Sequence, residues 1–352
     1  MMKIIERELK LFVRSGAWIT AIVFAFIMVF CIGLAITGTI NKVPIGISAE
    51  IEEKEAILDR FSNDSRFKIF ESKGEESARE LIKKGDYRAA IIVSKNINNI
   101  TSVIILIDST DFTLKEQIKY LINSYIYETL GYLGENLNVQ TLELYNNKEF
   151  FAYIGPGILA LSILGAGLFG ASETILHEKD KKLIDNVLVS GFSPFRFVVE
   201  KIISFMITIS IISIICFILI VTLGVGIPSL EAILTLITFT ILAELIFVSI
   251  GVSLSTLIPN EQVAGTAVAF VEFPIMFISG AFITLYQMNS NIIPIAQINP
   301  LTHVVEAFKA ILLKGAVLDD LISSLTYLII IAIVLLAISV ILMNRTLNKI
   351  QS

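Results

Sequence analysis

Six long runs of apolar residues constrain this chain more than any other feature of its sequence. A helix needs about 20 such residues to cross the hydrocarbon layer of a membrane. The runs cover Trp18–Ile36, Ile154–Ile175, Phe197–Val225, Leu230–Leu257, Val263–Leu285 and Leu321–Met343. We therefore predict an α-helical polytopic membrane protein with six transmembrane helices, the first of them within residues 15–38.

The composition agrees with a membrane protein and argues against several other classes. Of the 352 residues, 55% are hydrophobic and only 17% are charged, which is too apolar for an ordinary soluble domain. The net charge of −5 is small and does not indicate a nucleic-acid partner. Cys31 and Cys216 lie inside apolar runs, and neither His177 nor His303 has a second ligand at metal-binding spacing. No disulfide framework and no metal site are predicted.

Basic residues predict the orientation of the chain. They cluster before the first run, between the second and third runs, and after the last run. With six spans these three places lie on one side of the membrane, and the positive-inside rule makes that side the cytoplasm. We therefore predict a multi-pass protein of the plasma membrane with both termini cytoplasmic, including a short tail at residues 345–352.

The polar segment between the first two runs, residues 39–150, predicts a folded domain outside the membrane. Strand patterns occur at Val43–Ser48, Arg66–Ser72, Tyr87–Ser94 and Ser102–Asp108. Helical patterns occur at Glu52–Phe61, Glu75–Asp86 and Leu114–Leu133. Alternation of strands and helices predicts a small α/β domain, inserted between the first and second spans and extracellular.

The remaining five spans lie within residues 151–344, with an irregular amphipathic stretch at residues 287–316. Pro294 and Pro300 interrupt it, so a clean crossing is not expected. Pro300 can occupy the first turn of a helix, and apolar residues then recur along one face. A surface helix or a re-entrant helix on the extracellular side fits this pattern.

The segment His177–Lys201 is longer and more charged than a turn between two spans requires. Leu183, Ile184, Val187 and Leu188 recur at helical spacing, opposite charged and polar residues. Such a helix can connect two spans or dock into a partner protein. An interfacial membrane anchor fits less well, because aromatic residues and a dense basic face are missing.

This segment resembles the cytoplasmic loop of permeases of the ABC type-2 transporter family. Those permeases have a charged pair, a short helix ending in leucines, a break made by a small residue and proline, and a lysine opening the next span. Glu178–Lys179, Leu183–Leu188, Ser193–Pro194 and Lys201 take these places here. The chain departs from the family at Lys181–Lys182, where Gly-Thr is usual.

Two later stretches and the polar segment strengthen the resemblance. Phe273–Leu285 is similar to the fifth span of the family. Ile298–Gly315 resembles the family element Asn-Pro-Leu-Thr-Tyr-x-x-Glu-Ala-x-Arg, with His303 in place of the tyrosine and Lys309 in place of the arginine. Within residues 39–150, Asp86–Asn96 and Ile105–Asp111 look like the version of the family with a large extracellular insert. The resemblance covers essentially the whole chain.

The resemblance implies the membrane subunit of an ATP-driven exporter that works by alternating access. A separate ABC ATP-binding subunit, in two copies, would hydrolyse ATP, and a second permease copy would form a homodimer or heterodimer with this one. The sequence contains no G-x-x-x-x-G-K-[ST] phosphate loop, so we expect no enzyme and no cofactor on this chain, with ATP and Mg on the partner. Residues 1–14 fit the amphipathic cytoplasmic elbow helix of these permeases.

The resemblance also assigns candidate residues to the cytoplasmic coupling helix, residues 177–196, and to the re-entrant element. The ATPase-coupling candidates are Glu178, Lys179, Leu183, Ile184, Val187, Leu188, Ser193, Pro194 and Arg196. The re-entrant candidates are Asn299, Pro300, His303 and Glu306.

Two carboxylates inside the predicted spans are candidates for the translocation path. Ionisable residues are costly in the membrane and are functional candidates for that reason, which selects Glu244 and Glu272. Ser279 is the third candidate. Alternatively, each carboxylate bonds a neighbouring helix, for example at Ser249 or Thr266.

Two other function classes are weighed against export. A membrane-anchored receptor would bind a ligand at its extracellular domain and signal through the cytoplasmic loop, but five further spans exceed what it needs. An intramembrane enzyme would need a catalytic constellation such as H-E-x-x-H or G-x-S-x-G, and neither occurs. The exported substrate is left open among drugs, ions, peptides and lipid-like molecules.

Overall fold

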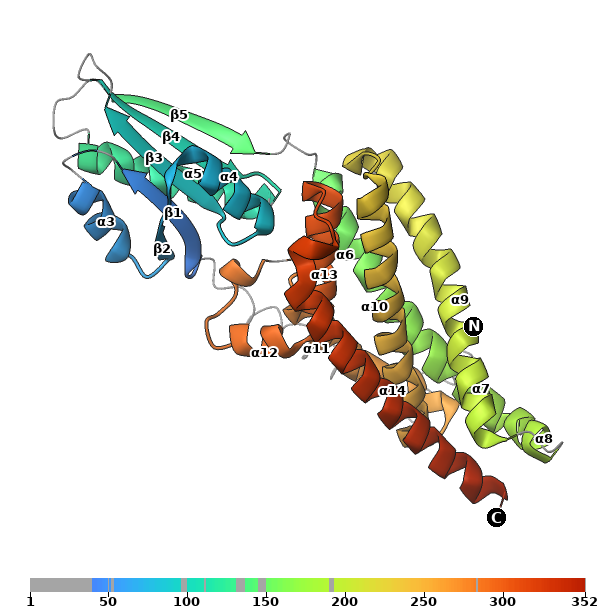
Figure 1. Ribbon diagram of the computed structural model, residues 1–352. Helices are drawn as coiled ribbons and strands as arrows, with labels where there is room; N and C mark the ends of the chain where they lie inside the picture. Colours follow the sequence, from blue (N-terminus) through green and yellow to red (C-terminus); the bar gives the residue numbers. More distant parts are fainter. Residues whose placement is uncertain are drawn as a thin grey trace, which may run out of the picture.

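The protein is described by a computed structural model in which an α/β domain precedes a helical bundle (Figure 1). The described residues are 40–49, 51, 54–95, 100–110, 112–130, 137–144, 150–189, 193–282 and 284–351. The predicted elbow helix at residues 1–14 and the predicted first span at residues 15–38 lie outside these residues.

A five-stranded mixed sheet forms the centre of the α/β domain. Its strands are β1 Val43–Ala49, β2 Phe67–Glu71, β3 Ala89–Lys95, β4 Thr101–Asp108 and β5 Leu137–Leu144. The strand order is β2-β1-β3-β4-β5, and only β3 and β4 pair antiparallel. The four predicted strands are confirmed, whereas β5 was not predicted.

Three helices cover the two faces of this sheet. They are α3 Lys54–Ser62, α4 Gly74–Lys84 and α5 Phe112–Leu130. Successive residues of a strand point to opposite faces, so Ile91 packs in the layer with α3 and α5, while Ala90 packs in the layer with α4. Gly85 ends α4 in the left-handed conformation, with φ 88°, which glycine adopts without steric cost.

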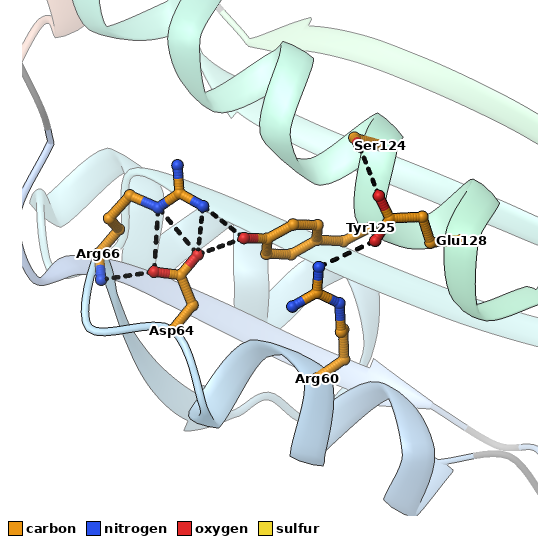
Figure 2. Close-up of polar contacts among 6 residues, drawn as sticks. All are labelled: Arg60, Asp64, Arg66, Ser124, Tyr125 and Glu128. Atoms are coloured by element: carbon orange, nitrogen blue, oxygen red, sulfur yellow. Dashed lines mark hydrogen bonds and ion pairs between the residues drawn. The ribbon is translucent and has the colours of Figure 1, made fainter.

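A cluster of polar contacts joins α3 and the turn after it to α5 (Figure 2). The Asp64 carboxylate accepts hydrogen bonds from Arg66 Nε, at 3.0 and 2.9 Å, and from the Tyr125 hydroxyl. Arg60 Nη2 donates to Glu128 Oε2 at 2.8 Å, and its guanidinium lies 3.8 Å from the centre of the Tyr125 ring. These contacts fix the two helices on the same face of the sheet.

The bundle contains long apolar helices joined by short segments. Its elements are α6 Phe150–Gly165, η2 Ala166–Gly170, α7 Ala171–Asp180, α8 Leu183–Val189, α9 Pro194–Ile220, η3 Val221–Val225, α10 Leu230–Leu257, η4 Glu261–Val263, α11 Ala264–Ile278, η5 Leu285–Gln287, α12 Ile293–Ile298, α13 Pro300–Lys314, η6 Leu318–Leu321 and α14 Ile322–Gln351. A π-helical turn, η2, joins α6 to α7 without interrupting the helix.

Four helices of the described residues are long and apolar enough to cross a membrane. They span Ile154–Asp180, Pro194–Ile220, Leu230–Leu257 and Leu318–Asn348, and they correspond to the predicted second, third, fourth and sixth spans. The six predicted spans are therefore not all present as long helices among the described residues.

The predicted fifth span, Val263–Leu285, forms a shorter helix than expected. The α11 helix has 15 residues and is about 22 Å long, less than the roughly 30 Å of the hydrocarbon layer. It ends at Ile278 because the chain then turns at Gly280, whose φ of 81° does not continue a helix. Residues 279–282 thus belong to a turn rather than to the end of a span.

The α10 helix lies at the centre of the bundle and packs against α6, η2, α7, α9, α13 and α14. Its backbone passes η2 so closely that a Cβ added at Gly251 would lie 2.3 Å from the carbonyl oxygen of Gly167. A Cβ at Gly167 would in turn lie 2.7 Å from Cβ of Phe247. Only glycine at both positions allows this crossing.

Two sets of contacts join the α/β domain to the bundle. Asn41 donates its backbone N–H to the carbonyl of Tyr286 at 2.7 Å and its side-chain amide to the carbonyl of Met288 at 3.1 Å. At the end of α13, Lys314 forms an ion pair with Asp108 at the end of β4. In Figure 1 the α/β domain occupies one end of the bundle, and α8 lies at the opposite end.

Candidate functional site

The predicted coupling loop folds as the end of α7, a turn, the short helix α8 and the start of α9. Lys182 makes the turn with φ 56°, a left-handed conformation, and its carbonyl accepts a hydrogen bond from the backbone N–H of Asn186 at 3.3 Å. Pro194 is the first residue of α9, where its missing N–H is not needed. The loop is thus a helix–turn–helix corner at the end of the bundle.

Ion pairs fix the base of this corner. Lys201 of α9 pairs with Glu178 of α7. His177 Nδ1 donates to Glu261, with 3.0 Å to each carboxylate oxygen, and Asp180 Oδ2 accepts the backbone N–H of Glu261 at 2.9 Å. The residues that precede α8 are therefore held against both α9 and the segment before α11.

The apolar residues of the corner divide into an inner and an outer set. Ile184 is only 1% exposed and belongs to the core of the bundle, where α8 contacts α14. Leu183 is 47% exposed, Val189 is 88% exposed and Phe195 is also exposed. Ile184 therefore anchors α8, while the other three residues form an apolar surface open to a partner.

The other coupling candidates lie around this surface. Ser193 and Arg196 are exposed, and Arg196 Nε donates to Glu200 one turn later at 2.7 Å. Lys179 is half-buried. The side chains of Val187 and Leu188 lie outside the described part of the chain, so their share in the surface stays a prediction.

Glu244 is fully buried between α9 and α10. Both of its carboxylate oxygens accept from the Ser210 hydroxyl, at 3.0 and 2.9 Å. The partner is therefore Ser210, and neither Ser249 nor Thr266 bonds this carboxylate among the described residues. This contact gives Glu244 a role in joining two helices.

Glu272 differs from Glu244 in burial and contacts. It is half-buried on α11, beside α6. A Cβ added at Gly165 would lie 3.3 Å from Glu272 Oε1. Among the described residues no side chain forms a hydrogen bond or ion pair with this carboxylate. Glu272 is thus a carboxylate within an apolar helix that faces the junction of α6 and η2.

Ser279 ends α11 and is fully buried. Its hydroxyl donates to the carbonyl of Met276 at 2.6 Å and accepts the backbone N–H of Ala281 at 3.2 Å. The side chain therefore stabilises the turn after α11, and the structure gives it this local role.

Asn299 joins the start of α13 to α11. Its Oδ1 accepts the backbone N–H of Leu301 at 3.0 Å, and its Nδ2 donates to the carbonyl of Ile275 at 2.7 Å. Pro300 is the first residue of α13, as predicted. The start of α13 thus lies beside the last turn of α11.

Both histidines have protein partners. His177 bonds Glu261, while His303 Nε2 donates to the carbonyl of Gln297 at 2.9 Å and its ring lies 4.2 Å from that of Tyr327. Among the described residues, no group of three His, Cys, Asp or Glu side chains is placed to hold a metal ion.

Glu306, the last re-entrant candidate, lines a cavity of about 180 Å³ between the α/β domain and the bundle. This junction cavity is formed by the end of α4, the turn after β4, the turn after α11, α13 and the start of α14. No sequence pattern indicated it, because its lining comes from five separate segments that meet only in the folded protein.

Comparison with known proteins places the chain among transport proteins. The family model described as ABC-2 family transporter protein matches residues 16–341. Two curated relatives, each called inner membrane transport permease YhhJ, come from Escherichia coli (strain K12) and Shigella flexneri. Each is 24% identical over 332 residues, covering 88% of this chain and 87% of the relative. No solved structure gives a significant match.

Proposed function

Because the chain belongs to the ABC-2 family and is a permease subunit of such a transporter, we propose that it exports a substrate with energy from a separate ABC ATP-binding subunit. The observation that carries this proposal is the helical corner at the end of the bundle opposite the α/β domain. Its base is fixed by ion pairs, while Leu183, Val189 and Phe195 remain exposed. An exposed apolar surface on a rigid base suits docking of another subunit.

The contacts of the corner support a coupling mechanism. When the ATP-binding subunits close on ATP, a force on α8 passes through Ile184 to α14 and through α7 to η2 and α6. The Lys201–Glu178 pair keeps α9 moving with α7. Two permease copies and two ATP-binding subunits form the transporter, and re-orientation of the helices opens the path to alternate sides.

The topology we propose has six crossings with both termini in the cytoplasm. Its first crossing is residues 15–38, and its α/β domain is extracellular. The fifth crossing is supported by the positions of Glu261, beside the coupling corner, and Tyr286, beside the α/β domain. The α13 helix is re-entrant, because Asn299 places its start beside Ile275 within α11, and Lys314 places its end at the α/β domain.

Glu272 is the residue we propose for the translocation path. It contrasts with Glu244, whose oxygens are occupied by Ser210. A carboxylate without a hydrogen-bond partner among the described residues is available to a polar or cationic group of a substrate. The substrate class stays open among drugs, ions, peptides and lipid-like molecules.

The docking surface is tested by co-purification with the ATP-binding subunit. Leu183→Asp and Val189→Asp place a charge on the exposed apolar surface, and we expect both to abolish pairing and transport while membrane insertion is retained. Asn186→Asp adds the same charge to an exposed polar position of α8 and should pair normally. If both apolar variants still co-purify with the ATP-binding subunit, the docking proposal is wrong.

A further inference from the structure

The junction cavity carries features of a binding site that neither docking nor transport requires. It lies where the turn after α11, the end of α13 and the start of α14 meet the α/β domain. Its volume of about 180 Å³ is several times the roughly 30 Å³ that one water occupies in the liquid. It is smaller than the roughly 300–1,000 Å³ of pockets for drug-sized ligands, so a small chemical group suits it.

Two buried polar atoms of residues that line the cavity have no partner in the described part of the chain. Thr284 is only 8% exposed, and its hydroxyl forms no hydrogen bond with any residue that the structure describes. The Nε of Arg88 is likewise buried and unpaired. Buried polar groups are normally hydrogen-bonded, so two unpaired ones at a single cavity indicate a missing acceptor.

The charge of the lining favours an anion. Five basic side chains line the cavity, from Lys83, Lys84, Arg88, Lys309 and Lys314, against two acidic ones, Glu306 and Asp320. Two further carboxylates lie behind the lining, since Asp108 pairs with Arg88 and Lys314 and Glu80 pairs with Lys84. Asp86 also acts on Lys84, so the excess of three positive charges is confined to the lining itself and is balanced by the carboxylates behind it.

Arg88 remains charged in this setting. Burial opposes its charge, but Tyr286, Asp108 and Glu306 together raise the pKa of Arg88 above its ordinary value. Its guanidinium also lies 5.3 Å from the centre of the Tyr286 ring. The side chain is thus held at the cavity by contacts that leave its Nε–H free to donate.

We propose that the junction cavity binds a phosphate group, held by the Thr284 hydroxyl, the Arg88 guanidinium and the surrounding lysines. Phosphate oxygens accept several hydrogen bonds and carry the charge that the lining lacks. The group comes either from free inorganic phosphate or from the headgroup of a membrane phospholipid, because the cavity adjoins the beginning of α14. The proposal does not depend on the direction of transport.

The test uses the full-length protein in detergent and two probes. Inorganic phosphate is titrated by calorimetry, and native mass spectrometry measures phosphatidylglycerol retained after purification from vesicles of that lipid. Thr284→Val removes only the hydroxyl and should weaken binding about tenfold, the worth of a hydrogen bond to a charged group. Lys83→Gln, an exposed position at the cavity, should weaken it about twofold.

The matched control is Thr238→Val, since that hydroxyl donates to Leu234 of its own helix on an exposed face. It should bind both probes as the unaltered protein does. Loss of phosphate affinity in the two cavity variants identifies a free anion as the ligand, and loss of retained lipid identifies a headgroup. No saturable binding of either probe by the unaltered protein overturns the proposal. So does unchanged binding in both cavity variants.

Discussion

Lys314, the last residue of α13, pairs with Asp108, the last residue of β4, and both side chains are almost fully buried. Asp108 also accepts from Arg88 Nη1 at 3.0 Å, so one carboxylate balances two cations from different parts of the protein. Burial raises the pKa of Asp108, but Lys314 and Arg88 outweigh it and hold this pKa below its ordinary value. This pair is thus a buried ion pair that joins the α/β domain to the bundle.

Asp108→Asn should destabilise the protein more than Lys314→Met does. Removing the carboxylate takes away the charge that both cations share, which costs roughly 3–5 kcal/mol, whereas removing the lysine leaves Asp108 paired with Arg88. Thermal unfolding in detergent measures both. Arg79→Met breaks an exposed pair with Glu75 and should cost no more than about 0.5 kcal/mol. Equal losses in all three variants would contradict this account of Asp108.

Gly251→Ala should be strongly destabilising, because its Cβ would overlap the carbonyl oxygen of Gly167. Such overpacking costs about 2 kcal/mol or more. Gly170→Ala is the control, since a Cβ there meets nothing within 4 Å and alanine favours a helix by up to about 1 kcal/mol. Unfolding in detergent should rank the unaltered protein between the two variants. Tolerance of Gly251→Ala would show that α10 and η2 do not cross this closely.

Acid should weaken the contact between α3 and α5 through Asp64. Burial raises its pKa, but hydrogen bonds from Arg66 and Tyr125 outweigh this and hold the pKa at about 2, below the ordinary 3.8. Because the pKa is depressed in the folded state, the stabilisation of about 2 kcal/mol is complete above about pH 4 and is lost as pH falls towards 2.

Asp64→Asn should therefore remove this stabilisation at neutral pH and reduce the acid sensitivity of thermal unfolding. Asp59→Asn, an exposed position of α3, is the matched control and should leave unfolding nearly unchanged. An Asp64→Asn variant as stable as the unaltered protein at about pH 6 would contradict the role of this carboxylate.

Glu272→Gln and Glu244→Gln should differ in transport. Glutamine at position 272 removes the charge proposed for the path, so transport should fall while the complex with the ATP-binding subunit still assembles. Glutamine at position 244 keeps an acceptor for the Ser210 hydroxyl, so transport should be largely retained. Flux into inverted vesicles and co-purification measure the two properties separately. Normal transport by Glu272→Gln would leave that residue with a packing role only.

Local patterns predicted most of the elements, because each depends on neighbouring residues alone. The four predicted strands and the four long helices follow from runs of apolar residues. The β5 strand was not predicted, although Leu137, Asn138, Val139 and Gln140 alternate between apolar and polar and between half-buried and exposed, as an edge strand does. The early end of α11 depends on Ser279 and Gly280. Both residues lie within one apolar run, so their effect on the length of the helix is hard to foresee.

The candidate site was less predictable, since its contacts join distant segments. The coupling corner was expected from its own residues, and Lys182, which stands where the family usually has threonine, proves to make a left-handed turn. Its fixation by Glu261 and Lys201 was not expected. Glu244 bonds a serine of a neighbouring helix, which was one of the alternatives expected, but the serine is Ser210 rather than either example named, because only packing brings α9 and α10 together.

The π-helical turn at Ala166–Gly170 carries one residue more than an α-helical path would need. Each residue advances a helix by about 100°. This single inserted residue therefore sets the direction in which the side chains of α7 point between η2 and the corner. Deleting one residue here would leave a span of almost the same length and hydropathy. It would also rotate His177 and Glu178 away from Glu261 and Lys201. The two ends of the continuous helix formed by α6, η2 and α7 would then no longer be coupled.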